Sequence, residues 1–550
     1  MSPAATIRHV FAPLSGVRRS GRMLKVALTL FYLALAAPMT GLVMLALSGK
    51  TGLIQLAWTR GLSDSFRDTT LLLAGVGLLS ATIGVGTAWL IAMNRFPGRT
   101  ILGALLVLPL ALPTYLAAYI AVELGDFYGP AQSTYRWLFN YTSRRDYEFP
   151  EVRSLTGAVL VFSLVLYPYI YLPARLMFEK QGSSIIQAAR LHGAKGFRLF
   201  FRIGLPLARP AIVGGVVFAL LETLNDIGAV EHLGVQSLSL TIRSIWLNRG
   251  DLPGAAQLAL IGLMLVTAIL ALEFMARRQS SYAGPTRATP PVIPAQISGF
   301  KAFAAGLACA TPVILGFGLP AIFLGIEALR MILKSGPPAD LLRTLLNSVG
   351  LSVTAGIIVA AIGGIVALAA RLLRGPAAAF APRAAMLGYA IPGTVLVIAL
   401  LPVFAVVDDG FERLGMPIVL SGSVVAILLA YLVRFTGIGV TQAETALSRI
   451  SQNVDHAART LGRDRTQIAL TVLAPNLVRA LGIAGLFAFV DAMKELPATL
   501  LLRPLNMETL ATSIYAKASG GAFEDGAIEA LLLLLIGLLP VLLLNRQRRG

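Results

Sequence analysis

The sequence is poor in the residues that build metal centres, disulfides and soluble catalytic sites. It has one cysteine, Cys309, among 550 residues, so no disulfide can form within the chain and a metal–thiolate site has too few ligands. Four histidines lie far apart without metal-ligand spacing: His9, His192, His232 and His456. No Gly-x-x-x-x-Gly-Lys-Ser/Thr loop is present, which excludes ATP hydrolysis by the usual route. No catalytic site is therefore expected.

Charge is also scarce, and apolar residues take its place. Charged residues make up 13% of the chain, against about a quarter in a soluble domain. Hydrophobic residues make up 56%, with a mean hydropathy of +0.76, and they come in blocks of about 20. Because backbone groups in lipid must be satisfied within their own segment, such blocks predict helices. The predicted fold class is an all-α integral membrane protein with about twelve transmembrane helices.

Twelve apolar runs form two sets of six. They lie near residues 25–48, 69–93, 101–122, 156–178, 208–230, 256–276, 302–333, 346–372, 384–407, 418–440, 478–493 and 526–544. The fifth and eleventh are short and polar at their ends.

The excess of cations predicts the orientation of these runs. The formal net charge is +19, and the Lys and Arg residues gather at the N-terminus, in the tail and in alternate loops. Those loops are 94–99, 179–209, 277–301, 371–383 and 449–479. Cations on one side of a membrane protein mark the cytoplasm. We therefore expect both termini to be cytoplasmic. We attribute the positive charge to orientation in the lipid bilayer, and we expect no nucleic-acid partner.

A proline-rich stretch divides the chain near its middle. Ser280–Ser298 has four prolines among small polar residues, a composition typical of linkers. We predict a first half over 1–279, a cytoplasmic linker over 280–299 and a second half over 300–550.

The two halves repeat one another. Gln187–Gly193 (QAARLHG) matches His456–Gly462 (HAARTLG) at an offset of 269 residues. Three further pairs correspond at that offset: Pro206 with Pro475, Asp226 with Glu495, and Ala229 with Ala498. Ala111–Thr114 resembles Ala390–Gly393 at an offset of 279. Parallel repeats predict a pseudo-two-fold axis along the membrane normal, with a pathway between the halves.

The repeated loops have a distinctive order of residues. In the first, a short helix ends at Gly193, a basic amphipathic segment follows, and Pro206 opens the next apolar run. The second loop repeats this order with Gly462 and Pro475. Paired alanines in each helix, Ala188-Ala189 and Ala457-Ala458, would let another surface approach the backbone closely.

Both loops resemble the "EAA" loop of ABC importer permeases, in which Glu-Ala-Ala is followed by Gly and then by Ile-x-Leu-Pro. The resemblance implies that each loop forms a coupling helix that binds in a groove on an ATPase subunit. The residues carried over are Gln187, Ala188, Ala189, Gly193, Leu205, Pro206, His456, Ala457, Ala458, Gly462 and Pro475. Two departures stand out: Gln187 and His456 replace the family's glutamate, and the second Leu-Pro is Ala474-Pro475.

Other segments resemble the fused permeases of bacterial ferric-iron importers. They are Leu108–Tyr115, Tyr167–Tyr169, Asp226–Gly234 and, most distinctively, Lys494–Pro504 (KELPATLLLRP). The resemblance implies a multi-pass protein of the bacterial inner membrane that is not itself an enzyme. Its partners would be a periplasmic substrate-binding protein and two P-loop ATPase subunits, which bind the ATP and Mg²⁺; no cofactor is expected in this chain. Thiamine, 2-aminoethylphosphonate and polyamine permeases share the plan and remain alternatives.

Asp226 and Glu495 are the candidate pathway residues. Carboxylates within a membrane are expensive and usually functional, and these two occupy equivalent places after the fifth and eleventh runs. They could contact a ferric ion transiently, or they could cap helix turns; no tightly bound metal is expected. A twelve-span secondary transporter is the main rival. It would need a substrate or proton site at the midplane, but midspan charges are few, with Glu222 and Glu273 near span ends, and it would give no reason for the duplicated loops.

Overall fold

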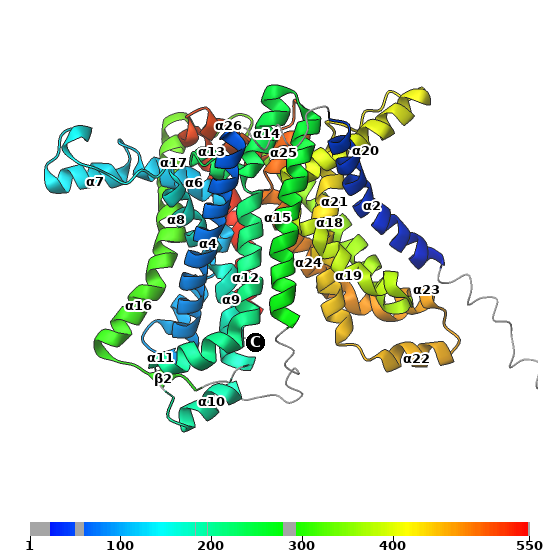
Figure 1. The fold of residues 1–550 in the computed structure, drawn as a ribbon, viewed down its shortest axis with the longest axis horizontal. Coiled ribbons are helices and arrows are strands. Elements are labelled where there is room, and N and C mark those ends of the chain that lie inside the picture. The colour runs from blue at the N-terminus through cyan, green and yellow to red at the C-terminus, as the bar shows by residue number, and fades with distance from the viewer. Residues whose placement is uncertain (1–21, 50–59, 182, 195, 279–292, 548–550) are drawn as a thin grey trace, which may run out of the picture.

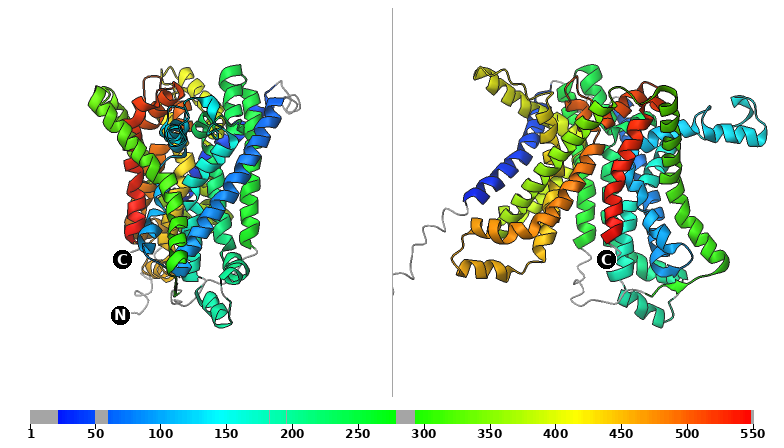
Figure 2. Two further views of the ribbon diagram at one scale, coloured as in Figure 1. Left: turned by 90° about the vertical axis from the view of Figure 1, so that its left-hand side faces the viewer. Right: turned by 180° about the vertical axis from the view of Figure 1, so that it is seen from behind.

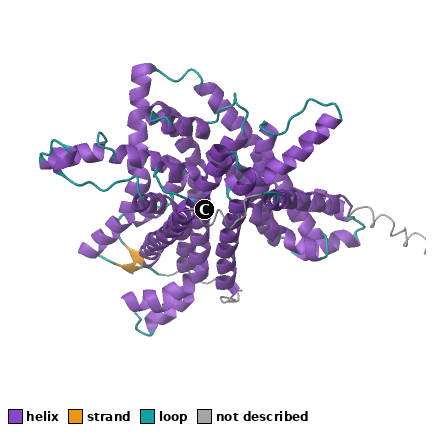
Figure 3. Cartoon of the chain, turned by 45° about the horizontal axis from the view of Figure 1, so that its top comes forward, coloured by secondary structure: helices purple, strands orange, loops and turns teal. Residues whose placement is uncertain are grey.

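The computed structural model describes residues 22–49, 60–181, 183–194, 196–278 and 293–547. Nearly all of this chain is helical, and the one sheet in the described part is a parallel pair of two-residue strands, shown in Figure 3. The expected all-α membrane fold is confirmed. Short 3₁₀ and π segments are labelled η below.

The bounds of the elements follow the chain in Figure 1. Up to the middle of the chain they are α2 Arg22–Leu47, α4 Arg60–Met93, β1 Asn94–Arg95, α5 Arg99–Leu105, η2 Leu108–Ala111, α6 Thr114–Gly125, α7 Pro130–Phe139, η3 Arg144–Asp146, α8 Leu155–Leu166, α9 Pro168–Leu176, η4 Met177–Gln181, α10 Ser183–Leu191, α11 Gly196–Leu199, η5 Phe200–Gly204, α12 Leu205–Asn225, α13 Ile227–His232, α14 Leu238–Arg249 and α15 Leu252–Arg278. Beyond it they are β2 Ala295–Gln296, α16 Gly299–Val313, η6 Ile314–Gly318, α17 Leu319–Ser335, α18 Leu341–Leu372, α19 Pro376–Ala390, α20 Gly393–Arg413, α21 Val424–Ser448, α22 Gln452–Thr460, α23 Arg465–Gln467, η7 Ile468–Leu473, α24 Ala474–Lys494, α25 Pro497–Leu502, α26 Leu510–Ser519, η8 Phe523–Gly526 and α27 Ala527–Gln547.

Ten helices within the described residues are long and apolar enough to cross a membrane, or eleven if one bent pair counts as a span. That pair, 99–111 and 114–139, bends by 96°. Its break coincides with Leu112-Pro113, and the ninth run breaks at the corresponding Ile391-Pro392. A residue before proline is driven out of the helical region, and both Leu112 and Ile391 are extended. The full count of twelve stays a prediction.

Helix bounds recur at the offset that the sequence repeat predicts. Ser183–Leu191 and Gln452–Thr460 are both nine-residue helices 269 residues apart, and Leu205–Asn225 and Ala474–Lys494 have the same spacing. The fifth apolar run was expected to reach residue 230, but α12 ends at Asn225 because Asp226 is extended and caps a new helix. The same break follows α24.

Each half lends its first helix to the other. The N-terminal α2 packs against α15, α18 and α20, whereas α16 and α17 pack against α4, α5, α6 and α27. Figures 1 and 2 show α2 and α16 on opposite flanks of the bundle. Through this exchange each group of helices includes a segment from the other half of the chain.

Close helix packing depends on glycine at matching places. A Cβ at Gly84 of α4 would lie 2.8 Å from the Tyr167 carbonyl oxygen, and one at Gly363 of α18 would lie 2.5 Å from the Cα of Gly439. These positions are 279 residues apart. Small residues at such contacts let backbones approach within a membrane, where the hydrophobic effect does not drive helices together.

The repeated loops lie at one end of the molecule. Figure 1 shows α10 and α22 there, on separate groups of helices, together with the start of α2 and the end of α27. Among the described residues, the basic segments of α10, α11 and α22 lie at this end. Residues 279–292, most of the expected linker, lie outside the described part of the chain; beyond them, Ala295 and Gln296 pair with Asn94 and Arg95.

Candidate functional site

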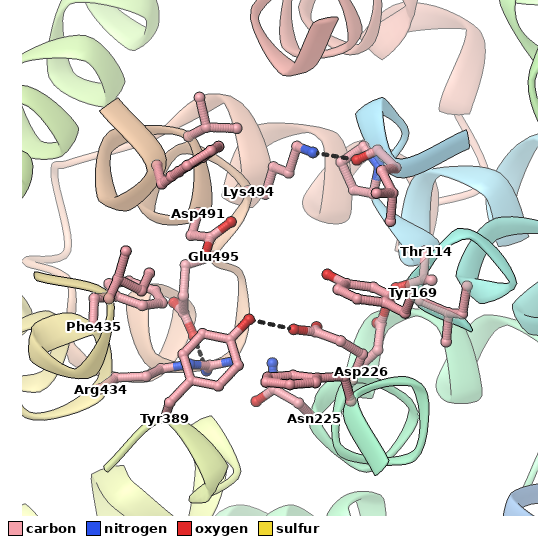
Figure 4. A pocket seen from close by; sticks show the side chains of 18 of the residues that line it. Thr114, Tyr169, Asn225, Asp226, Tyr389, Arg434, Phe435, Asp491, Lys494 and Glu495 are labelled. Carbon is pink, nitrogen blue, oxygen red and sulfur yellow. Dashed lines mark hydrogen bonds and ion pairs between the residues drawn. The ribbon is translucent and has the colours of Figure 1, made fainter. Parts of the chain in front are cut away.

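A cavity of about 490 Å³ lies between the two halves and is lined by residues of α12 and α24 among others. Figure 4 shows polar side chains from several helices converging on it. Equivalent positions line it from both sides: Phe218 and Phe487, Glu222 and Asp491, Asn225 and Lys494, Asp226 and Glu495. The cavity therefore sits where the sequence repeat predicts a pathway.

Asp226 lines this cavity but is occupied as a helix cap. Its carboxylate accepts hydrogen bonds from the backbone N–H of Ala229, at 2.8 Å, and from the hydroxyl of Thr114. The residue is buried, with 8% of its surface exposed. Asp226 thus caps the start of α13 and links it by a hydrogen bond to Thr114, the first residue of α6.

Glu495 is held in the same way by more partners. Its carboxylate accepts hydrogen bonds from the backbone N–H groups of Ala498 and Thr499, both at 3.0 Å, and from the Thr499 hydroxyl. The Arg434 guanidinium lies 3.1 Å away, and both side chains are almost fully buried. Helix capping, the alternative left open by the sequence, is what these two carboxylates do in this conformation.

The carboxylates that sequence reasoning missed are one turn earlier. Glu222 accepts a hydrogen bond from the Tyr389 hydroxyl at 2.9 Å. Asp491, its equivalent, has no hydrogen bond or ion pair to any described residue, and Figure 4 shows it facing the open space. Tyr169 also points its hydroxyl there. The signal was available, since Glu222 and Asp491 correspond at the offset of 269.

Two hydrogen bonds join the halves beside the cavity, next to the capping carboxylates. The backbone N–H of Gly393 donates to the Asn225 side-chain oxygen at 2.8 Å. The Lys494 ammonium donates to the Leu110 carbonyl oxygen at 2.7 Å. Asn225 is the last residue of α12, and Lys494 is the last residue of α24. Each forms a hydrogen bond with the opposite half, close to its Leu-Pro or Ile-Pro break, so equivalent positions make equivalent contacts.

The cavity has more acidic than basic side chains. Its lining includes four carboxylates, on Glu222, Asp226, Asp491 and Glu495, and two cations, on Arg434 and Lys494. Both cations are engaged, Arg434 with Glu495 and Lys494 with a carbonyl oxygen. No group of three or more His, Cys, Asp or Glu residues in the described ranges could hold a metal ion. The carboxylates of the cavity therefore outnumber its cationic side chains, and the cations are the more fully engaged.

The first repeated loop presents small residues on its surface. Ala188 is exposed, and Gln187 and Ala189 are half-buried. Gly193 has φ 81° and Gly462 has φ 80°, so the left-handed turn expected after each helix is confirmed. Pro206 and Pro475 stand in the first turn of α12 and α24, as the sequence indicates. In the second loop His456 and Ala457 are exposed, while Ala458 is buried.

Each loop is fixed to its half by a different contact. Asp455 of α22 accepts hydrogen bonds from the Arg371 guanidinium at 2.8 and 3.2 Å, and Arg371 also donates to the Ile450 carbonyl oxygen. Ile186, at the position equivalent to Asp455, is fully buried in an apolar core. Arg190 of α10 donates to the Ile293 carbonyl oxygen at 2.6 Å.

The fold, the paired loops and the cavity between halves define a membrane-spanning importer subunit, and comparison with known proteins places it in a family. The family described as "Binding-protein-dependent transport system inner membrane component" matches residues 80–281. The chain is 32% identical over 215 residues to the molybdenum transport system permease protein ModB of Escherichia coli, covering 90% of that protein. The chain belongs to this family of ABC importer permeases.

Two other relatives differ in length and in the substrate they are named for. The Fe(3+)-transport system permease protein FbpB 2 of Haemophilus influenzae is 23% identical over 533 residues, which covers 96% of this chain and 99% of that protein. The sulfate transport system permease protein CysT of Escherichia coli is 29% identical over 225 residues, covering 39% of this chain and 75% of that protein. The chain is thus a multi-pass inner-membrane permease, and its relatives are named for the transport of different substrates, Fe(3+), molybdenum and sulfate.

Proposed function

We propose that this permease translocates ferric iron, delivered by a periplasmic binding protein, through the cavity between its halves. Two P-loop ATPase subunits bind α10 and α22 on the cytoplasmic side, where both termini lie, and supply the ATP and Mg²⁺. ATP binding draws the two loops together and opens the end of the cavity next to Asn225 and Lys494. The cavity then faces each side of the membrane in turn.

The excess of carboxylates in the cavity carries this proposal. An oxyanion such as molybdate or sulfate would need uncommitted cations or N–H donors, whereas Arg434 and Lys494 are already engaged. A ferric ion prefers hard oxygen ligands, which Asp491, Glu222, Tyr169 and Tyr389 offer around one space. The match to an iron permease over nearly the whole chain supports the same substrate.

Uptake of labelled iron by cells that depend on this permease tests the proposal, with molybdate, sulfate, thiamine, 2-aminoethylphosphonate and polyamine as competitors. We expect iron uptake that none of these displaces. Uptake of any of them without iron transport would overturn the substrate and leave the importer architecture intact.

Two double variants separate pathway from capping residues. Glu222→Gln with Asp491→Asn should lower iron uptake by about tenfold or more, equivalent to ~1.4 kcal/mol, while the ATPase still co-purifies. Asp226→Asn with Glu495→Gln should instead lower the stability of the protein. An amide oxygen is a poorer acceptor than a carboxylate for the buried N–H groups that donate to these two residues. If the second pair lost uptake at unchanged stability and the first pair did not, the pathway would run along the caps.

A further inference from the structure

A lateral arm, residues 126–154, leaves the bundle between α6 and α8. Figures 1 and 2 show its helix α7 lying across the direction of the spanning helices, beyond the edge of the bundle. It lies towards the end opposite α10 and α22, below the outermost loops of that end. The arm therefore reaches sideways at a level that the membrane-spanning helices still occupy.

The arm is held in shape by its own polar contacts. The Gln132 amide donates to the Gly125 carbonyl oxygen at 2.8 Å and accepts from the Tyr147 hydroxyl at 2.7 Å. The Arg136 guanidinium donates to the Phe127 carbonyl oxygen at 2.7 Å and to Tyr147, and lies 4.1 Å from the centre of the Phe127 ring. Arg136 is the one charged residue of α7, and these contacts turn it away from the outer face.

The outer face of α7 is apolar. Trp137 is 79% exposed and Leu138 is 62% exposed; Phe139, the next residue of α7, and Tyr128, which precedes the helix, are also exposed. Thr134 lies one turn before Trp137 and Leu138 on the same face and is exposed too. Monomeric proteins rarely present such a cluster to water without a partner for it.

The charged side chains of the arm lie elsewhere. Asp126, Arg144, Glu148, Glu151 and Arg153 line a groove of about 470 Å³ between the return segment of the arm and the end of α6. The arm is thus amphipathic as a unit, with charge gathered at this groove and aromatic and aliphatic residues on α7. Exposed tryptophan and aliphatic residues on a helix, with an exposed tyrosine close by in the chain, are typical of helices that lie in the interface of a bilayer.

We propose that α7 is an interfacial anchor, which lies in the headgroup region of the leaflet opposite the coupling loops and inserts Trp137 and Leu138 towards the acyl chains. The occupant is lipid and not a protein, because the arm points away from the pseudo-two-fold axis, over the area that the surrounding bilayer covers. Its rigid internal contacts present the apolar face without a partner chain. This anchor does not depend on which substrate the permease carries.

Spin labels attached to single introduced cysteines test the anchor in the full-length permease in vesicles of phosphatidylethanolamine and phosphatidylglycerol. Cys309 is fully buried and can stay in place. The test position is Leu138→Cys, with Ile322→Cys on the exposed face of α17 as a lipid control and Arg145→Cys on the return segment as a water control. Collision of each label with oxygen, which partitions into lipid, and with a water-soluble nickel complex gives its depth.

The label at Leu138 should resemble that at Ile322, with an oxygen-to-nickel accessibility ratio severalfold above that at Arg145. A label at Thr134→Cys should move towards the water value when Trp137→Asp and Leu138→Asp are introduced. Nickel accessibility at Leu138 equal to that at Arg145 would overturn the anchor. Immobilisation of the Leu138 label only after addition of the binding protein would also overturn it, in favour of a protein-docking face.

Discussion

The two halves of this permease share a backbone plan but fill it with different chemistry. Residues 371 and 455 form a buried ion pair in the second half, whereas the corresponding residues of the first half, Ala92 and Ile186, are buried and apolar. At the cavity, Tyr389 donates to Glu222, but Leu110 stands at the position equivalent to Tyr389 and offers no hydroxyl to Asp491.

These differences show which features of the repeat the fold requires. The lengths of α10 and α22 and of α12 and α24 recur, as do the left-handed glycine turns and the breaks before Pro113 and Pro392, because they depend on backbone geometry. The contact that holds a coupling helix in place can differ between the halves, as an ion pair in one and an apolar side chain in the other. Arg190, which donates to the Ile293 carbonyl oxygen, ties the first loop to the expected linker itself.

The largest expected effect is at the ion pair. Arg371→Ala would leave Asp455 buried without its partner, and breaking a buried pair in this way costs about 3–5 kcal/mol. We expect the midpoint of thermal unfolding in mixed micelles to fall. Because α22 would lose its ion pair with α18, we also expect less ATPase to co-purify.

The matched control copies the first half into the second. Arg371→Ala combined with Asp455→Ile reproduces the Ala92 and Ile186 arrangement and should recover much of the loss, because apolar replacements of buried pairs are often tolerated. A double variant no more stable than Arg371→Ala alone would show that the bonds from Arg371 to the Ile450 and Ser451 carbonyl oxygens, and not the pair, hold the loop.

A smaller effect is expected where hydrogen bonds join the halves beside the cavity. Lys494→Met removes a charged donor from the Leu110 carbonyl oxygen, a bond worth about 1.5–3 kcal/mol, whereas Asn225→Leu removes a neutral acceptor from Gly393, worth about 0.5–1.5 kcal/mol. Both should ease opening, so basal ATPase activity of the assembled transporter should rise, and rise more for Lys494→Met. Equal ATPase activities in the two variants would mean that the charged contact of Lys494 contributes no more than the neutral contact of Asn225.

The sequence could predict the fold class, the offset of the repeat and the turns at Gly193 and Gly462, because these follow from local patterns of apolar residues, glycine and proline. It left open whether Asp226 and Glu495 cap helix turns, and it did not single out Asp491 as the carboxylate that faces the cavity. Which way a carboxylate points depends on partners far along the chain, such as Thr114 and Arg434. The exchange of α2 and α16 between halves was equally hidden, since hydropathy marks a span but not its neighbour.

The smallest expected effect on stability is at the glycine turns, where it should also be nearly equal in the two halves. An added Cβ at Gly193 or Gly462 meets no atom within 4 Å, so Gly193→Ala or Gly462→Ala costs only the strain of a left-handed backbone, about 1 kcal/mol. Asparagine tolerates that conformation better and is the control. Because the space is empty in this subunit, a bulky residue at both positions should leave the protein inserted and folded but abolish transport by obstructing the ATPase. Normal transport with bulky residues at both turns would show that α10 and α22 are not the coupling helices.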